Sequence, residues 1–222
     1  MVNGITRFSL SVVWMFFTFF LPSFAIGQVN EGKVIYAVSY PDSRLDSNSV
    51  LPTESVTFFK DHKIRIDLQS GRGIENRVIV DNRKEVIHVL TDMMGDRTAV
   101  MMTKKDVEEE TKSQKLPEFT VTDESKTIAG YRCIKANATL ADGRKFTIWF
   151  TKEIKIENAN WNNQFRDVDG FLMEFTTQQG AINMQMTAKN VSIEKIDDTV
   201  FNIPESYRIV TKNELNRMSK GK

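Results

Sequence analysis

The stretch "SVTFFKDHKIRIDLQ", Ser55–Gln69, decides the fold because it encodes two strands and the turn between them. Apolar and polar residues alternate in both halves, which is the pattern of a strand with one buried face. In the second half, Ile64, Ile66 and Leu68 point to the same side. The Asp-His pair at 61–62 lies between the halves and is typical of a tight turn. The stretch therefore predicts an antiparallel hairpin with one apolar face.

The same alternation continues on both sides of this hairpin. It occurs in "KVIYAVSY" (33–40), in "RVIVDNRKEVIHVLTD" (77–92) and in "RTAVMMT" (97–103). A longer hairpin, "YRCIKANATLADGRKFTIWFTKEI" (131–154), contains the Asp-Gly pair at 142–143, which favours a primed turn. Consecutive hairpins of this kind predict a meander of antiparallel strands.

A further hairpin joins "FLMEFTT" (171–177) to "INMQMTAKNVSIEKI" (182–196), which brings the expected number of strands to roughly ten. We predict a mainly β fold, a single large curved antiparallel sheet that forms a half-barrel with a helix or loop cover. The pair Thr211 and Glu214 forms a capping box and predicts a short helix at the carboxyl end. Several central strands are apolar on both faces, so the second face must also be covered or hold a ligand.

Two polar segments interrupt the alternation. The charged run "KKDVEEETKSQKLPEF", 104–119, could be a solvated loop or a short helix, and its sparse apolar residues and Pro117 favour the loop. The Asn-rich run "ENANWNNQFRDVDG", 157–170, predicts a long loop or an irregular cover.

Residues 1–27 have the features of a secretory signal peptide. Arg7 precedes an apolar run that Pro22 ends, and small residues follow it at the expected cleavage position. The run is shorter than the ~20 residues of a membrane-spanning helix, so we expect no integral membrane protein. No cysteine follows the cleavage position, which excludes the usual lipid anchor. We predict export to the periplasm and a single soluble domain over 28–222.

The charge balance argues against a nucleic-acid partner. Cleavage of residues 1–27 removes one basic residue and no acidic one, so 29 of the 30 basic side chains remain against 29 acidic ones. Such a chain has no long-range electrostatic field that would attract nucleic acid or an anionic membrane surface.

Catalytic chemistry finds little support in the sequence. The two histidines, His62 and His88, are far apart, and neither has a partner at zinc-ligand spacing. The single cysteine, Cys133, lies in a predicted strand and is expected to be a buried, unreactive residue. The chain also lacks the glycine patterns of nucleotide-binding loops and the motif of serine hydrolases. We therefore expect no enzyme, no cofactor and no metal.

The remaining candidates are apolar side chains, several of them methionines, which adapt to variable apolar shapes. They could fill an ordinary core or line a lipid pocket. The predicted lining residues are Ile64, Ile66, Val78, Val80, Met101, Phe146, Ile148, Phe150, Met173, Met184 and Met186.

Three stretches together carry a family resemblance: "KTIAGYRCIKANATLADGRKFTIWFTKEI" (126–154), "DGFLMEFTT" (169–177) and "IEKIDDTVFNIPESYRIVT" (193–211). In order and spacing they resemble a family of exported bacterial proteins of unknown function in the LolA-like superfamily of outer-membrane lipoprotein carriers. The resemblance implies a half-barrel whose concave face can hold acyl chains. Residues specific to the true carriers are not recognisable in this sequence, so no functional residue is transferred.

Two functions are compatible with these features. The first is a non-enzymatic periplasmic binding protein for a lipid, an acyl chain or another apolar molecule. The alternative is a structural or interaction module of the cell envelope, whose half-barrel is filled by its own side chains and which binds a protein partner.

Overall fold

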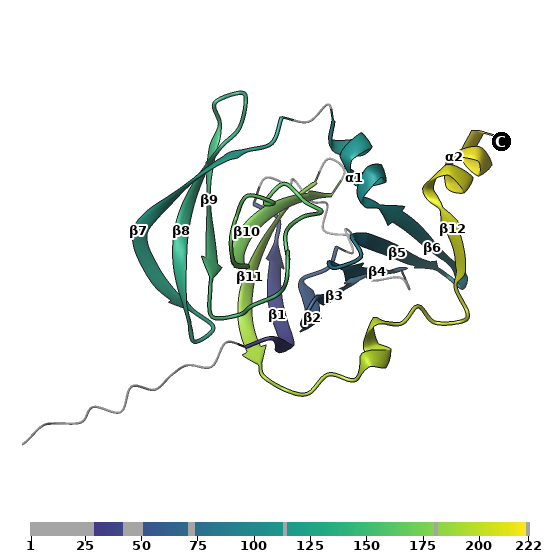
Figure 1. The fold of residues 1–222 in the computed structure, drawn as a ribbon, viewed down its shortest axis with the longest axis horizontal. Coiled ribbons are helices and arrows are strands. Elements are labelled where there is room, and N and C mark those ends of the chain that lie inside the picture. The colour runs from purple at the N-terminus through teal and green to yellow at the C-terminus, as the bar shows by residue number, and fades with distance from the viewer. Residues whose placement is uncertain (1–28, 42–50, 71–73, 113–114, 180–181, 221–222) are drawn as a thin grey trace, which may run out of the picture.

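The computed structural model describes residues 29–41, 51–70, 74–112, 115–179 and 182–220. They form one twelve-stranded sheet, which curves strongly around its concave side (Figure 1). Its strands are β1 (Glu31–Ser39), β2 (Glu54–Lys60), β3 (Lys63–Ser70), β4 (Ile74–Asp81), β5 (Val86–Met93), β6 (Asp96–Thr103), β7 (Glu118–Ile128), β8 (Tyr131–Thr139), β9 (Lys145–Thr151), β10 (Phe171–Gln179), β11 (Ile182–Ser192) and β12 (Arg208–Thr211). The predicted mainly β half-barrel is therefore confirmed, and the predicted signal peptide lies outside the described residues.

The strand order is β12-β6-β5-β4-β3-β2-β1-β11-β10-β9-β8-β7. Two meanders, β1 to β6 and β7 to β11, thus lie side by side, and β1 pairs with β11 where they meet. Every pairing is antiparallel except that of β12, which runs parallel to β6 at one edge. The hairpin that decides the fold forms as predicted, and its register places Phe59 opposite Ile64 and Thr57 opposite Ile66.

Left-handed backbone conformations make the tight turns that align the strands. Asp61 has a φ of 52° in the β2–β3 turn. Ala129 and Gly130 have φ values of 48° and 86°, as a two-residue primed turn between β7 and β8 requires. Gly143 also has a positive φ, of 83°, but Asp142 does not, so the primed turn predicted at 142–143 is wrong. The Gly143 N instead donates to the backbone oxygen of Leu140 at 2.9 Å. Turns with residues at positive φ therefore align the strands of these hairpins.

Two helices accompany the sheet, α1 (Lys104–Thr111) and α2 (Lys212–Lys220). None of the helices in the described part of the chain is long and apolar enough to cross a membrane. The capping box predicted for α2 is confirmed, since Thr211 donates from its backbone N and its Oγ1 to Glu214 Oε2 at 2.7 and 2.9 Å.

The loop predicted over 104–119 is wrong for its first half, which is α1. Thr103 caps this helix in a capping box: its Oγ1 accepts from the backbone N of Asp106 at 3.4 Å, and its own backbone N donates to Asp106 Oδ2 at 2.8 Å. Val107 is buried in a cluster with Ile64 and Trp161, so one apolar side chain anchors an otherwise charged helix to the sheet.

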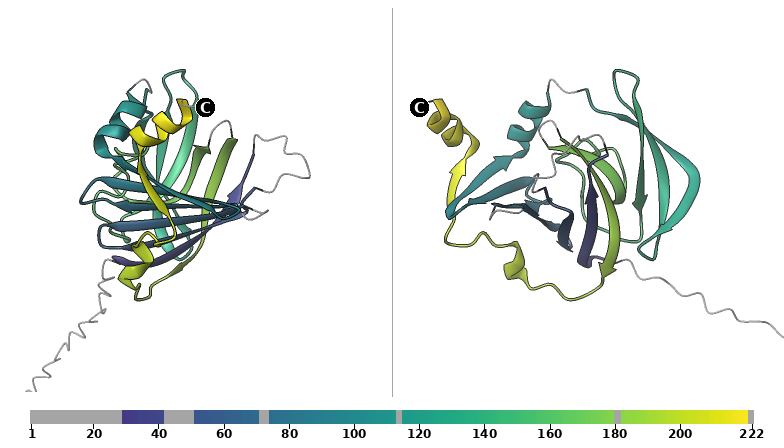
Figure 2. Two further views of the ribbon diagram at one scale, coloured as in Figure 1. Left: turned by 90° about the vertical axis from the view of Figure 1, so that its right-hand side faces the viewer. Right: turned by 180° about the vertical axis from the view of Figure 1, so that it is seen from behind.

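Both faces of the sheet are covered. The cover segment, defined as residues 152–170, lies against the concave side and includes the polar run 157–170, which is a long irregular segment as predicted. The outer strap, defined as residues 193–207, passes along the convex side from β11 to β12 (Figure 2). It includes a short 3₁₀ helix, Asp198–Phe201. Ile196 and Phe201 of the strap pack with Ile79, Leu90 and Ala99 of the sheet.

Candidate apolar binding site

A cavity of about 340 Å³ lies between the concave face of the sheet and the cover segment. Its volume is near the lower end of small-molecule pockets, which occupy about 300–1,000 Å³. The sheet contributes side chains from β1 to β4, β10 and β11, and the cover segment contributes the remainder. The lining residues are Tyr36, Thr57, Ile64, Ile66, Leu68, Val78, Ala159, Asn160, Asn162, Asn163, Phe165, Phe171, Leu172, Phe175, Thr177, Gln178, Met184 and Met186.

Strand register explains why these side chains meet. Thr57, Ile66 and Val78 stand opposite one another across β2, β3 and β4, so they share the concave face. On the other side of the curve, Met184 stands opposite Thr177 of β10 and Met186 opposite Phe175. Curvature then brings the two groups to face each other across the hollow.

Aromatic side chains form the floor and one wall of the cavity. The Tyr36 hydroxyl donates to the backbone oxygen of Leu172 at 2.7 Å, and its ring packs edge-on against Phe175 at 5.9 Å. Burial, together with the nearby Cys133, raises the pKa of Tyr36 well above its usual value, so the hydroxyl stays neutral. Phe165 of the cover segment is 1% exposed and contacts Phe175 with ring centroids 5.5 Å apart. A neutral, closely packed wall of this kind suits an apolar ligand.

Hydrogen bonds from two adjacent residues, Asn160 and Trp161, hold the cover segment in place. Asn160 donates from Nδ2 to the backbone oxygens of Val168 and Gly170 at 2.9 and 3.0 Å. Trp161 donates from Nε1 to Asn82 Oδ1 at 3.0 Å. These bonds connect buried amides and an indole, so they fix the shape of the segment without placing a charge in the hollow.

Gly170 ends the cover segment at a point of very close approach. A Cβ built there would lie 2.3 Å from Phe150 Cδ2 and 2.9 Å from the backbone oxygen of Thr151. Any larger residue would push the segment away from β9, because real Cβ atoms do not come so close. The absent side chain therefore allows the cover segment to return to the sheet.

The cavity wall is electrically neutral. Among the described residues that line it there is no aspartate, glutamate, lysine, arginine or histidine, and the polar groups are hydroxyls and amides. An ionised group placed deep in such a cavity would lose its hydration without gaining a partner, which costs several kcal/mol. The arrangement can therefore hold a hydrocarbon chain, and it cannot hold a buried charge.

Five of the predicted lining residues, Ile64, Ile66, Val78, Met184 and Met186, lie on the cavity wall. The others lie elsewhere. Val80 packs with Trp161 beside the cavity, Ile148 and Phe150 are buried in the cluster that contains Phe165, Met173 is buried in a cluster with Cys133, and Phe146 lines a neighbouring cleft.

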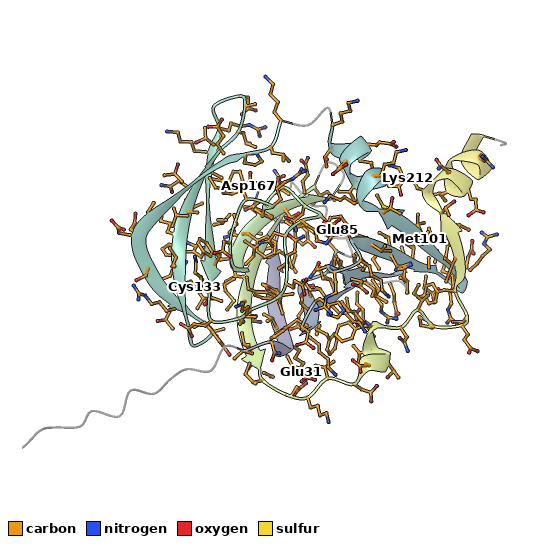
Figure 3. The ribbon with its side chains drawn as sticks, in the orientation of Figure 1. Glu31, Glu85, Met101, Cys133, Asp167 and Lys212 are labelled. Atoms are coloured by element: carbon orange, nitrogen blue, oxygen red, sulfur yellow. The ribbon has the colours of Figure 1, made fainter. Side chains whose placement is uncertain are left out.

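Met101 lies on the opposite face of the sheet. It stands opposite His88, which in turn stands opposite Ile79 of the strap-covered face. Its neighbour Met102 stands opposite Ile87 and packs with the concave-side cluster. Figure 3 marks Met101 on β6, and it marks Cys133 on the distant strand β8.

Residues of the wall that the sequence did not suggest come from two sources. Tyr36 and Leu68 share the alternation of predicted strands, so the period-two pattern could have identified them. Phe165 and the asparagines at 160, 162 and 163 belong to the cover segment, and no periodic signal indicates where an irregular segment folds back.

The thiol of Cys133, the single cysteine, does not line the cavity. Cys133 is fully buried, and burial raises the pKa of its thiol to about 11. A thiol with so high a pKa forms little thiolate at neutral pH, so it is a poor nucleophile. Among the residues that the structure describes, no three His, Cys, Asp or Glu side chains are grouped to hold a metal ion.

Comparisons with known proteins give fold similarity only. No family model matches the chain, and no curated protein matches it in sequence. A structure of PNGF-II in space group C2 matches with a TM-score of 0.51 and 15% identity, covering 86% of this chain and 32% of that one. The chain therefore spans about a third of that protein, whose sheet resembles this one.

Two further structures match at TM-scores too low to establish a common fold. A second crystal form of PNGF-II, in space group P21, matches with a TM-score of 0.49 and 13% identity, covering 85% of this chain and 33% of that one. LprF from Mycobacterium bovis matches with a TM-score of 0.29 and 14% identity, covering 77% of this chain and 91% of that one.

Proposed function

We propose that this chain is a non-enzymatic binding protein for a lipid, an acyl chain or another apolar molecule, acting in the periplasm after export. One observation carries the proposal: a neutral cavity of about 340 Å³ remains between the cover segment and the concave face. Its largely apolar wall is left in contact with water, and an apolar ligand that fills the space would remove that surface from water.

Three features support the assignment. The resemblance to LolA-like proteins implies a concave face that holds acyl chains, and the cavity lies on that face. Methionine side chains at 184 and 186 form part of the wall and adjust readily to a flexible chain. The absence of charge from the wall favours a hydrocarbon over a polar metabolite.

A fluorescent fatty-acid displacement assay tests this role on the protein that begins after residue 27. The variant Ile66→Trp places an indole in the cavity, and we expect it to weaken binding by at least about tenfold, or 1.4 kcal/mol. Val56→Trp is the matched control, because Val56 is a partly buried residue of the adjacent strand that points to the convex face. Thermal unfolding should show both variants folded.

The displacement assay has three informative outcomes. Displacement by wild type and Val56→Trp, together with its loss in Ile66→Trp, supports a binding site in the cavity. Equal binding by all three proteins places the ligand elsewhere and overturns the proposal. Wild-type protein that binds no apolar probe at micromolar concentration also overturns it.

The second candidate is an envelope interaction module. The cover segment favours it, since Trp161 and Phe165 already fill much of the hollow with the chain's own side chains. The edge strand β7 would then offer a pairing surface, and its Val121 side chain is 60% exposed. A photo-crosslinking residue at position 121 should capture the same envelope protein repeatedly in cells, and a proline at position 120 should abolish the capture. Failure to capture any protein would contradict this role.

A further inference from the structure

A basic cleft adjoins the apolar cavity and shares part of its wall. This cleft measures about 340 Å³ and is lined by Pro41, Leu140, Arg144, Lys145, Phe146, Gln164, Thr176, Thr177, Gln178 and Asn183. Thr177 and Gln178 of β10 line both spaces, so the cavity and the cleft have this part of their walls in common.

The two spaces differ in charge. The cavity wall contains no ionisable acid or base apart from the neutral Tyr36 hydroxyl. The cleft contains two cationic side chains, Arg144 and Lys145, and none of the described residues that line it is acidic. A molecule that extends from one space into the other would pass from an apolar environment to a positively charged one.

Arg144 and Lys145 differ in whether their charge is already paired with a carboxylate. Arg144 donates from Nε to Asp142 Oδ2 at 2.7 Å, within the exposed β8–β9 turn. Lys145 forms no ion pair with any residue that the structure describes. Its side chain is exposed and lines the cleft together with Thr177 and Gln178. An arginine held by one carboxylate keeps further N–H donors for a second anion.

We propose that the ligand is a single-chain amphiphile with a carboxylate head, whose chain lies in the cavity and whose head lies in the cleft near Arg144 and Lys145. This inference rests on the proposed function. The neutral wall excludes the charged head from the cavity. The cleft supplies a partly hydrated site where a carboxylate is paired with a cation at little desolvation cost.

The orientation follows from the topology. The β8–β9 turn and the β10–β11 connection lie at the same end of their strands, as the pairs Thr139–Lys145 and Gln179–Ile182 show. The cleft is therefore at the rim of the half-barrel, and the chain of the ligand points from the rim toward Ile64 and Tyr36 inside.

Ligands of equal chain length test the head group. Dodecanoate, dodecanol and dodecyltrimethylammonium should be compared as displacers of one fluorescent probe, at low and high ionic strength. We expect dodecanoate to bind about tenfold more tightly than dodecanol at low salt, a ratio that corresponds to about 1.4 kcal/mol. The cation should bind most weakly, and salt should reduce these differences because the cleft is exposed.

A charge-removal variant tests the residues. Arg144→Gln with Lys145→Gln should weaken dodecanoate by about tenfold and leave dodecanol unchanged. The matched control is Lys189→Gln with Lys195→Gln, because these two side chains are exposed, line neither the cavity nor the cleft, and remove the same charge.

The outcomes separate this inference from the proposed function. Equal affinities for the three ligands, or equal effects of the two double variants, overturn the head-group assignment, while binding that Ile66→Trp abolishes would leave the proposed function intact. If no ligand displaces the probe from wild type, both proposals fall. A selective loss of dodecanoate binding in the cleft variant supports the assignment.

Discussion

The two faces of the sheet are covered in different ways. On the convex face the outer strap is held by charged groups: Glu31 Oε1 accepts from the backbone N of Ile196 at 2.6 Å, and Arg65 donates to the backbone oxygen of Val200 at 3.0 Å. On the concave face the bonds next to the cavity are neutral, with Trp161 bonded to Asn82 and Asn160 bonded to its own segment. The ion pair of the cover segment with the sheet, between Glu157 and Arg83, lies on the exposed surface.

The difference reflects what each cover encloses. The strap packs Ile196 and Phe201 directly against the buried side chains of β4 to β6. The cover segment places Phe165 over the hollow and leaves the cavity beside it. Charged fastenings suit the partly solvated outer surface, and neutral ones keep charge away from an apolar cavity. The outer strap completes the hydrophobic core, and the cover segment encloses the cavity.

Phenylalanine truncation on each face should separate these roles most strongly. Phe201→Ala and Phe165→Ala each remove a buried ring and should each lower the free energy of unfolding by about 3–5 kcal/mol. Urea denaturation measures this loss. Only Phe165→Ala should change the affinity for an apolar probe, because only Phe165 lines the cavity. An affinity change of the same size in Phe201→Ala would show that the two covers do not act separately.

Loss of the hydrogen bond from the Trp161 indole should lower the unfolding free energy less than loss of a phenylalanine ring. Trp161→Phe removes the donor to Asn82 Oδ1 and leaves this amide, which is 2% exposed, without its partner. We expect a loss of about 1–3 kcal/mol in unfolding free energy. Trp149→Phe is the matched control, since the ring of Trp149 packs beneath the Lys126 ammonium and should tolerate the change. A larger loss in the control would contradict the role given to the Asn82 bond.

The sequence predicts the strands of the sheet well because one-sided burial leaves a period-two pattern. Ile64, Ile66 and Leu68 alternate with charged residues, and their shared face follows directly. The strand that contains Met101 does not alternate. Ala99 and Met101 face the strap while Val100 and Met102 face the hollow, so all four are apolar and the pattern cannot show which side each faces.

The remaining features depend on tertiary contacts. The helix α1 has a single buried apolar residue, Val107, so its charged sequence has the composition of a solvated loop. The sequence identifies the cover segment as irregular, but Phe165 reaches the hollow only because the half-barrel exists to receive it. Five lining residues on regular strands could be predicted, and the lining residues of the cover segment could not.

Changing the charged hydrogen bond that holds the strap should have the smallest effect on the unfolding free energy. Glu31→Gln keeps an acceptor for the backbone N of Ile196 and removes the negative charge, so a charge-assisted bond becomes a neutral one. We expect a loss of about 1 kcal/mol in unfolding free energy, measured by urea denaturation, and no change in ligand affinity. Glu194→Gln is the control, because its ion pair with Lys33 is more exposed and should matter less. If Glu31→Gln altered the affinity, the strap would be coupled to the cavity through β1, and the separation of the two faces would fail.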